Sequence, residues 1–370
     1  MANKFKESYD FSALDLDKQA VEEFHKELDN SLQVKFTSVK ERFRYLIDND
    51  YYVDIYEMGY TDKHIEELYE LLYSYDFKFQ SYMAISKFYR DYAMKTNDNQ
   101  RFLETYEDRI AIVSLSLGKG SIKSAKTKAK SMIEQRYQPA TPTFLNDGKT
   151  RRGERVSCFL VEMDDSLNSI GHYLNVAMQL SKIGGGVAIN LSKLRARGES
   201  IKGIEDSASG IVPPMKLLED AFSYADQLGQ RKGAGAVYLN VHHLDLIEYL
   251  NTKKINADEK VRIKSLSTGV VISDKFMEIL EKGEYFYMFA PHTVFQKYGV
   301  HMDDMDMDEW YDKLVDDPDI KKNSMKARTL MDMIADIQFQ SGYPYIIYSG
   351  NANHAHYLKD LGKIKMSNLC

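Results

Sequence analysis

Two cysteines are present among the 370 residues, Cys158 and Cys370. A thiolate is a nucleophile, and a pair of thiols supplies two electrons in one step, so this pair is the first candidate for chemistry. Each cysteine lies in or just after a run that is typical of a β-strand, at residues 155–161 and 363–366. We therefore expect the fold to bring both thiols to one pocket. The alternative is two unrelated buried thiols, because cysteine often packs as a small hydrophobic residue.

The composition limits the classes of protein that fit. Apolar residues make up 44% and charged residues 28% of the chain, as in soluble globular proteins. A net charge of −6 and a pI near 5.9 argue against a general nucleic-acid partner. No apolar run approaches the ~20 residues needed to span a bilayer, and no signal peptide is visible, so no membrane partner is expected. Two cysteines far apart are not a disulfide framework, which favours a cytoplasmic location.

Residues 1–140 are expected to form a helical domain. Apolar residues recur at helical spacing in several segments, and Thr61 is typical of an N-cap before such a segment. A basic stretch at 123–136 fits either a solvated helix face or a contact with nucleotide phosphate or an acidic partner. Pro139 and Pro142 then bracket a segment that should be extended, and this segment marks the expected domain boundary.

Residues 141–370 alternate strand and helix patterns. Helices are expected near residues 168–183, 214–225, 244–250, 275–281 and 327–340, the fourth of them capped by Asp274. Strands are expected near residues 155–161, 187–191, 236–241, 269–272, 285–289 and 345–348. This alternation favours an α/β architecture with a largely parallel sheet.

Two glycine-rich stretches could contact a ligand. The glycines at 184–186 follow a helix and precede a strand, so they do not match a dinucleotide fingerprint; they fit a tight turn or a place where a ligand touches backbone. The stretch 227–235 carries Arg231 and Lys232 among glycines and amides. It fits either a mobile loop that meets phosphate and base edges or an ordinary surface loop.

Two other groups suggest metal ligands only weakly. His242 and His243 are adjacent, and neighbouring strand residues point to opposite faces, so structural roles are favoured. The acidic residues at 303–309 lack the glycine and the final glutamate of a calcium loop. These acids are expected to favour the N-terminus of the following helix.

Short motifs occur in the order found in one enzyme family. They are Thr-Pro-Thr-Phe-Leu-Asn at 141–146, Val-Ser-Cys-Phe at 156–159, Gly-Gly-Gly-Val at 184–187, Gln-Arg-Lys-Gly-Ala at 230–234 and Ser-Asn-Leu-Cys at 367–370. Together they resemble the large (alpha) subunit of class Ib ribonucleoside-diphosphate reductase. The resemblance runs from about residue 35 to the end and covers the N-terminal half of such a subunit. It implies a helical domain followed by the first half of a ten-stranded α/β barrel, built from two five-stranded parallel halves.

The resemblance also implies roles for individual residues. Cys370 matches the radical cysteine, which removes the 3′ hydrogen of the ribose, and Asn368 matches the amide that binds the substrate hydroxyls. Cys158 matches one of two thiols that reduce C2′ as water leaves. The other positions that match the substrate site are Thr141, Ser157, Gly186 and Arg231.

A second set of residues matches the allosteric specificity site of the family. Asp165 and Arg195 match contacts to an effector, a deoxynucleoside triphosphate or ATP. The loop at 227–234, which begins at Gln227, matches the one that carries effector identity to the substrate base. A glycine-flanked loop can have two arrangements, as allosteric coupling requires.

The resemblance implies several partners and no directly bound cofactor. The substrates would be ribonucleoside diphosphates. The radical would come from a metal-containing small subunit, electrons from a glutaredoxin- or thioredoxin-like protein, and the large subunits would form a homodimer.

Several residues that the family uses, among them a glutamate two positions after the radical cysteine, have no counterpart in the 370 residues. The sequence alone is therefore expected to be inactive and to need the C-terminal half of the subunit. A split gene, an exon or intein boundary and a truncation all fit this ending. A cobalamin-dependent reductase and a non-catalytic deoxynucleotide-binding fragment are the alternative functions.

Overall fold

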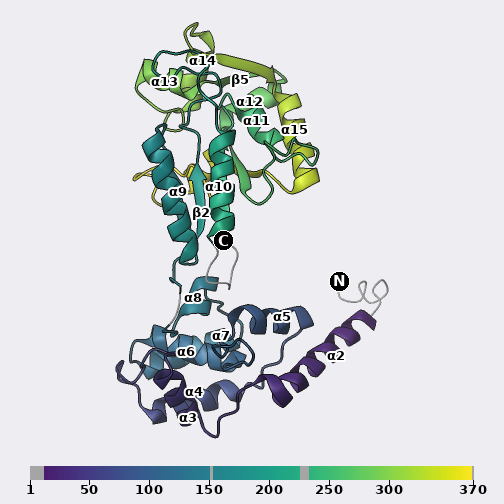
Figure 1. Ribbon diagram of the computed structural model, residues 1–370, viewed down its shortest axis with the longest axis vertical. Helices are drawn as coiled ribbons and strands as arrows, with labels where there is room; N and C mark the ends of the chain where they lie inside the picture. Colours follow the sequence, from purple (N-terminus) through teal and green to yellow (C-terminus); the bar gives the residue numbers. More distant parts are fainter. Residues whose placement is uncertain (1–11, 151–152, 226–232, 369–370) are drawn as a thin grey trace. The chain divides into compact units, whose positions relative to one another are not determined.

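The computed structural model describes residues 12–150, 153–225 and 233–368. The chain divides into two compact units, Met1–Val156 and Ser157–Cys370 (Figure 1). The first unit is helical and the second contains a parallel sheet with helices, in agreement with the expected α/β class. The division falls later in the chain than the expected boundary at 140/141.

The helical unit contains seven α-helices and two π-helical turns among its described residues. They are α2 (Ser12–Glu27), η1 (Leu28–Leu32), α3 (Val39–Asp48), α4 (Asp62–Tyr73), α5 (Tyr82–Lys87), η2 (Phe88–Tyr92), α6 (Tyr106–Gly118), α7 (Ile122–Ile133) and α8 (Thr141–Asn146). Side-chain caps explain several starts: Thr61 accepts a hydrogen bond from His64 N, as predicted, and Thr105 forms a capping box with Asp108.

The prediction of an extended segment around Pro142 was wrong. Residues Thr141–Asn146 form α8, with Pro142 in its first turn. Proline is tolerated there because the first backbone N–H groups of a helix have no partner within the helix. Phe144 is buried in the core of the helical unit, so packing reinforces the helix.

Charged groups are buried in the helical unit. Arg109 and Glu104 form a fully buried ion pair at 3.0 Å, and the Tyr52 hydroxyl donates to the same carboxylate at 2.7 Å. Lys149 donates to the Tyr92 carbonyl at 3.1 Å, and burial lowers its pKa to about 7. Arg109 of α6 also donates to the Asp147 carbonyl. Residues 147–149 are thereby bonded to α6 and to η2, which stabilises the end of this unit.

The second unit is built on a five-stranded parallel sheet. Its strands are β1 (Cys158–Glu162), β2 (Gly186–Asn190), β3 (Gly235–Asn240), β4 (Ser267–Ile272) and β7 (Tyr345–Tyr348), in that order across the sheet. Every neighbouring pair is parallel. The helices of this unit are α9 (Leu167–Lys182), α10 (Val212–Tyr224), α11 (Leu246–Asn251), α12 (Asp274–Lys282), α13 (Pro291–Tyr298), α14 (Met307–Asp316), α15 (Ala327–Ser341) and α16 (Ser349–Ala355).

The two faces of this sheet differ. On one, called the helix-covered face, large apolar side chains pack against α9, α10, α11, α12 and α15; they are Val187, Ile189, Val237, Leu239, Val270 and Ile272. The other, called the open face, carries small or polar side chains in alternation with them: Cys158, Gly186, Ala188, Asn190, Ala236, Tyr238, Asn240, Gly269 and Val271. Within the described chain a small cluster that includes Met366 covers the middle of the open face.

Three local predictions differ from the structure. The expected strand at 285–289 forms as β5 (Tyr285–Phe289), but it pairs antiparallel with β6 (Lys322–Lys326) in a separate two-stranded sheet. Residues 363–366 form no strand. Ser273, rather than Asp274, is the N-cap of α12 and accepts a hydrogen bond from Phe276 N. The acidic residues behave as expected, since Asp306 caps α14.

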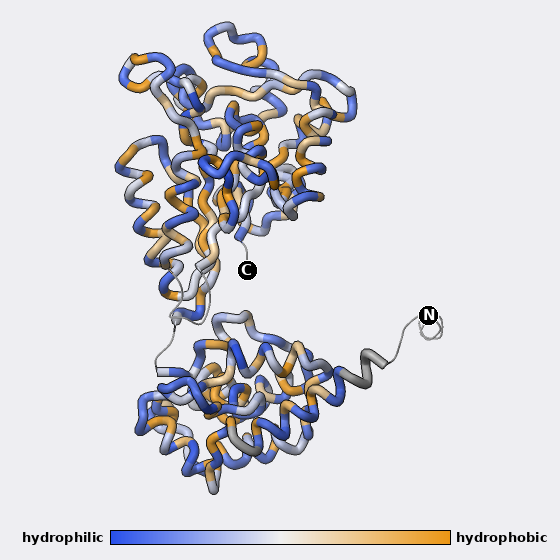
Figure 2. The backbone as a smooth tube through the Cα atoms, turned by 45° about the vertical axis from the view of Figure 1, so that its right-hand side comes forward, coloured by the Kyte–Doolittle hydropathy of each residue, from blue (hydrophilic) through white to orange (hydrophobic). Residues whose placement is uncertain are grey.

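Hydropathy follows this arrangement. Figure 2 shows hydrophobic segments along the central strands and alternating hydrophobic and hydrophilic positions along the helices. Such alternation is typical of helices with one face on a core. Among the described residues, none of the helices has the length and apolar character needed to cross a bilayer.

Candidate functional site

One edge of the open face brings together several predicted site residues. Cys158 is the first residue of β1 and pairs in register with Gly186, the first residue of β2. Cys158 is exposed, and its Sγ lies 3.7 Å from the hydroxyl of the buried Ser157. Gly186 N donates to the Ser157 carbonyl at 2.6 Å. The parallel pairing of β1 and β2 therefore places the thiol at a fixed position beside the Gly186 backbone.

Asn368 reaches this edge from the far end of the sequence. Its side-chain Nδ2 donates to the Gly186 carbonyl at 2.7 Å and to the Phe159 carbonyl at 3.1 Å. Two bonds to backbone fix the plane of the amide more firmly than one would. Cys158, Gly186 and Asn368 thus meet at one edge of the sheet, although more than 180 positions separate Gly186 from Asn368.

Asn368 belongs to a segment, residues 363–368, that crosses the open face and is called the crossing segment. Met366 is buried against Ala188, Ala236 and Val271, whose small or branched side chains leave room for it. Burial raises the pKa of the Tyr238 hydroxyl, and a hydrogen bond with Ser367 acts in the opposite direction. The open face therefore holds residues 366–368 through the apolar contact of Met366, the bond between Ser367 and Tyr238, and the two bonds of Asn368 to backbone.

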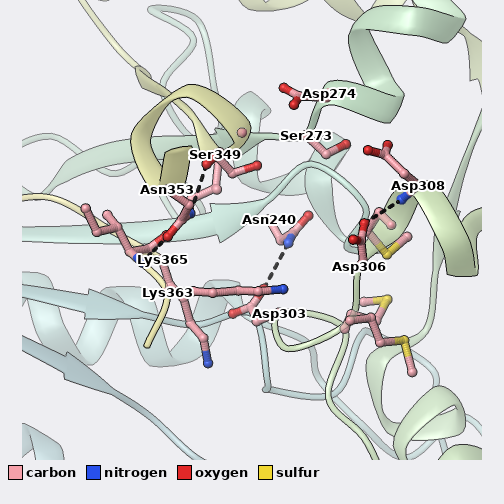
Figure 3. A pocket seen from close by; sticks show the side chains of 16 residues that line it. Asn240, Ser273, Asp274, Asp303, Asp306, Asp308, Ser349, Asn353, Lys363 and Lys365 are labelled. Atoms are coloured by element: carbon pink, nitrogen blue, oxygen red, sulfur yellow. Dashed lines mark hydrogen bonds between the residues drawn. The ribbon is translucent and has the colours of Figure 1, made fainter. Parts of the chain in front are cut away.

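A polar pocket of about 260 Å³ lies at the carboxyl ends of β3, β4 and β7 (Figure 3). Asn240, Ser273 and Ser349 line it from the ends of the strands, and Lys363 and Lys365 from the crossing segment. In parallel α/β sheets this end of the strands commonly contributes to binding sites. Figure 3 shows Asn353 lying between Ser349 and the crossing segment.

A partly buried carboxylate, that of Asp303, lines one side of this pocket. Asp303 accepts hydrogen bonds from Asn190 Nδ2 at 2.6 Å and from Asn240 Nδ2 at 2.9 Å. Burial raises the pKa of Asp303, while these two hydrogen bonds lower it by a smaller amount. The loop before α14 is therefore attached to the ends of β2 and β3 on the open face.

The two described residues of the predicted effector site contact each other. Arg195 Nε lies 2.7 Å from Asp165 Oδ2, and Arg195 N donates to Asp165 Oδ1 at 3.1 Å. Arg195 Nη1 also donates to the Ser200 carbonyl at 2.6 Å. His292 Nδ1 lies 3.5 Å from Asp165 Oδ2. An arginine, a carboxylate and an imidazole at one place could bind the phosphate and sugar of a nucleotide.

The remaining predicted residues belong to the helical unit or are outside the described residues. Cys370, Gln227 and Arg231 lie outside the described residues. Thr141 belongs to the helical unit, where its hydroxyl lies 3.3 Å from the Tyr92 hydroxyl at the start of α8. Among residues 12–150, 153–225 and 233–368, no group of three or more histidine, cysteine or acidic side chains is arranged to hold a metal ion.

Sequence reasoning missed several contact residues. Asn353 and Tyr238 bond to the crossing segment, and Lys365 within the segment pairs with Asp304. His292 lies beside Asp165. No local pattern distinguishes Asn353 from other asparagines, because its partner is a backbone group eleven residues later. The position of His292, directly after a strand and in the first turn of α13, was the one available signal.

Comparison with protein families agrees with this architecture. The family described as "Ribonucleotide reductase, barrel domain" matches residues 156–370, more than half of the chain. The chain belongs to the ribonucleotide reductase family. Two further descriptions match the helical part, "Ribonucleotide reductase, all-alpha domain" at 78–152 and "Ribonucleotide reductase N-terminal" at 1–77. The five parallel strands are the visible part of the ribonucleotide reductase barrel.

Curated relatives support the same family. The chain is 50% identical over 356 residues to "Ribonucleoside-diphosphate reductase subunit alpha" of Bacillus subtilis, covering 96% of this chain and 51% of that protein. It is 46% identical over 362 residues to the protein of the same name from Mycoplasma genitalium, covering 98% of the chain and 50% of the relative. The chain therefore spans about half the length of these relatives. A more distant relative, "Ribonucleoside-diphosphate reductase large subunit" of Dictyostelium discoideum, is 31% identical over 319 residues, covering 82% of the chain and 36% of the relative.

Proposed function

We propose that the chain forms part of the large subunit of a ribonucleoside-diphosphate reductase, which makes deoxyribonucleoside diphosphates for DNA synthesis. The main support is the meeting of Cys158, Gly186 and Asn368 at one edge of the open face. At this edge lie the thiol assigned to the reduction at C2′ and the amide assigned to the ribose hydroxyls, with the amide oriented by its bonds to backbone.

The proposed reaction assigns one step to each cysteine. Cys370, as a thiyl radical, removes the 3′ hydrogen of the ribose and later returns a hydrogen atom to C3′. Cys158 and a second thiol supply two electrons and two hydrogens as the C2′–O bond breaks, so that water leaves and the two sulfurs form a disulfide. Asn368 binds the ribose hydroxyls, with Thr141, Ser157, Gly186 and Arg231 lining the substrate site.

The second reducing thiol is neither of the two cysteines with assigned roles, so another polypeptide segment supplies it. We propose that this segment corresponds to the remaining half of the relatives' length. The other proposed partners are a metal-containing small subunit that generates the radical, a glutaredoxin- or thioredoxin-like reductant and a second copy of the large subunit. The proposed location is the cytoplasm.

Reconstitution tests the assignment of the cysteines. The chain is combined with a polypeptide that covers the rest of the relatives' length, a small subunit and a dithiol reductant, and deoxynucleotide formation is measured. Turnover is expected for the wild type and for the surface control Lys359→Ala, and neither Cys370→Ser nor Cys158→Ser should turn over. Full activity of the Cys370→Ser assembly would refute the role of the radical cysteine.

We also propose that Asp165 and Arg195, with the loop that begins at Gln227, bind a deoxynucleoside triphosphate or ATP as effector. Arg195 is held at 2.7 Å from Asp165, which presents its guanidinium beside a carboxylate suited to a ribose hydroxyl. Calorimetry should show affinity about tenfold or more lower in Arg195→Ala, since a hydrogen bond to a charged group contributes ~1.5–3 kcal/mol.

Arg197→Ala is the matched control for this measurement. Arg197 lies two positions away and pairs with Glu248 at 2.8 Å on the surface, so its loss should leave effector binding unchanged. Equal affinities of the wild type and the Arg195→Ala variant would contradict the effector assignment.

A further inference from the structure

The segment at 363–368 is held by a side chain in place of a neighbouring strand. Asn353 lies in α16, and its Oδ1 accepts from Ile364 N at 2.6 Å while its Nδ2 donates to the Ile364 carbonyl at 3.0 Å. One amide thereby satisfies both polar groups of a single residue, as a paired strand would. This explains why residues 363–366 remain ordered in position without forming the strand that their sequence suggests.

Asn353 is itself connected to the end of the sheet. Its Nδ2 also donates to the Ser349 carbonyl at 2.9 Å, and the Ser349 hydroxyl donates to the carbonyl of Ile272 at 3.0 Å. Ile272 is the last residue of β4, so the chain of contacts runs from the sheet through α16 to Ile364. The anchor is therefore connected through Ser349 to the end of β4.

Lys365 forms the second anchor, on the other side of the segment. Its Nζ lies 2.5 Å from Asp304 and 3.2 Å from Glu162, the last residue of β1, and its side chain is only 14% exposed. Burial alone would lower the pKa of Lys365, but Asp304 and Glu162 together raise it. The cation stays charged in a partly buried place, where its ion pairs are screened less than at the surface.

These anchors define a register. Ile364 contacts α16, Lys365 contacts β1 and Asp304, Met366 contacts β2, β3 and β4, and Asn368 contacts β1 and β2. A shift of the segment by one residue would break these contacts together. We propose that Asn353 and Lys365 are positioning residues, which set the register of residues 363–368 across the open face. In that register Asn368 reaches Phe159 and Gly186, and the chain continues from there to Cys370. The catalytic consequence rests on the proposed function.

The register can be measured without turnover. In a Cys370→Ser background, nitroxide labels are attached to Cys158 and to the exposed position 367 through Ser367→Cys. Because Asn368 bonds to the residue next to Cys158, the two labels should show strong dipolar broadening in the electron paramagnetic resonance spectrum. Asn353→Ala and Lys365→Met should each reduce the broadening, whereas Lys365→Arg should keep it.

Asn351→Ala is the matched control, since Asn351 is an exposed asparagine on the same helix. It should leave the broadening unchanged. Unchanged broadening in both Asn353→Ala and Lys365→Met would overturn the proposal. If circular dichroism shows that Asn353→Ala does not fold, Lys365→Met and its Lys365→Arg rescue decide the question.

Kinetics separate this proposal from the proposed function. In the reconstituted enzyme with native cysteines, Asn353→Ala should lower kcat with KM little changed, because Asn353 would act through the crossing segment and not through substrate. A kcat equal to that of the wild type, together with lost broadening, would overturn the catalytic part. A reconstituted wild type without reductase activity would refute the proposed function and leave the register measurement standing.

Discussion

The same strands place different kinds of side chain on the two faces of the five-stranded sheet. Val187 and Ile189 of β2 point to the helix-covered face and are fully buried in its large core. Ala188 and Asn190, which alternate with them, point to the open face, where one contacts the Met366 cluster and the other bonds to Asp303. The helix-covered face is built of bulky apolar residues that exclude water, and the open face mainly of small or polar ones, with Tyr238 as a large exception.

The difference shows how one strand can satisfy stability and function together. A strand alternates its side chains between two faces, so residues on one face can change with little effect on the other. Burial of large apolar side chains on the helix-covered face supplies most of the stabilisation. The small residues on the open face supply little, but they admit the crossing segment and leave Cys158 exposed beside Gly186 and Asn368.

The largest expected effect separates the two faces by stability. Ile189→Ala removes a fully buried side chain from the helix-covered face and should lower the free energy of unfolding by ~2–5 kcal/mol. Ile347→Ala removes the same side chain from the open face, where it is only partly buried, and should cost less than half as much. Urea denaturation measures both values. Equal losses would show that the open face is packed as a core.

A smaller effect should appear in the pH dependence of the free energy of unfolding. Its sign should differ between His242, in the core on the helix-covered side, and Asp303, at the open face. His242 follows β3 and packs against Phe286 and Tyr311 of the helix-side core, and burial lowers its pKa from 6.5 to about 3. Between these values the unfolded chain binds a proton that the folded chain does not. The contribution of neutral His242 to the free energy of unfolding is therefore complete above pH 6.5. It falls on acidification by about 1.4 kcal/mol per pH unit.

Asp303 on the open face behaves in the opposite way. Burial raises its pKa above 3.8, so its contribution is complete below pH 3.8 and is lost as the pH rises through the raised value. Urea denaturation of the wild type, His242→Phe and Asp303→Asn at several pH values tests both signs. The stability advantage of the wild type over His242→Phe should shrink in acid, and that over Asp303→Asn should grow. Parallel curves for all three proteins would contradict the assignment of either group.

The strands of the parallel sheet were predictable from the sequence, whereas the conformations of two segments outside the sheet were not. Alternation of apolar residues with turn signals located β2, β3 and β4 because these strands are buried and their patterns are strong. The same reasoning expected an extended chain at Pro142, where the packing of Phe144 favours a helix. It also expected a strand at 363–366, where bonds to Asn353 replace a partner strand. Contacts between distant residues decide both cases.

The candidate site was likewise predictable only in part. Residue types alone singled out Cys158, and the resemblance to a family added Asn368 and Gly186, whose meeting the structure describes. Physical reasoning from the sequence could not have found Asn353 or Lys365. Their partners are a backbone group at 364 and carboxylates at 162 and 304, and none of these is close enough in sequence to leave a periodic signal.

The smallest expected effect tests how closely the open face fits the crossing segment. Gly269 of β4 lies against the ring of Tyr238, and a Cβ at this position would come within 2.2–2.8 Å of ring atoms. Gly269→Ala should therefore force Tyr238 to move and cost ~1–3 kcal/mol of stability. Because Tyr238 packs in the same cluster as Met366, the shift should also weaken the dipolar broadening between labels at 158 and 367.

Gly171→Ala is the matched control for the same substitution on a helix. Gly171 lies inside α9 with no atom within 4 Å of an added Cβ, so alanine should stabilise the protein by ~0.5–1 kcal/mol through its higher helix propensity. Opposite signs at 269 and 171 would show that the open face is fitted to Tyr238 and, through it, to residues 366–368. A Gly269→Ala variant as stable as the wild type, with unchanged broadening, would mean that Tyr238 can accommodate the added methyl group without disturbing the crossing segment. In that case the register would depend on Asn353 and Lys365 alone.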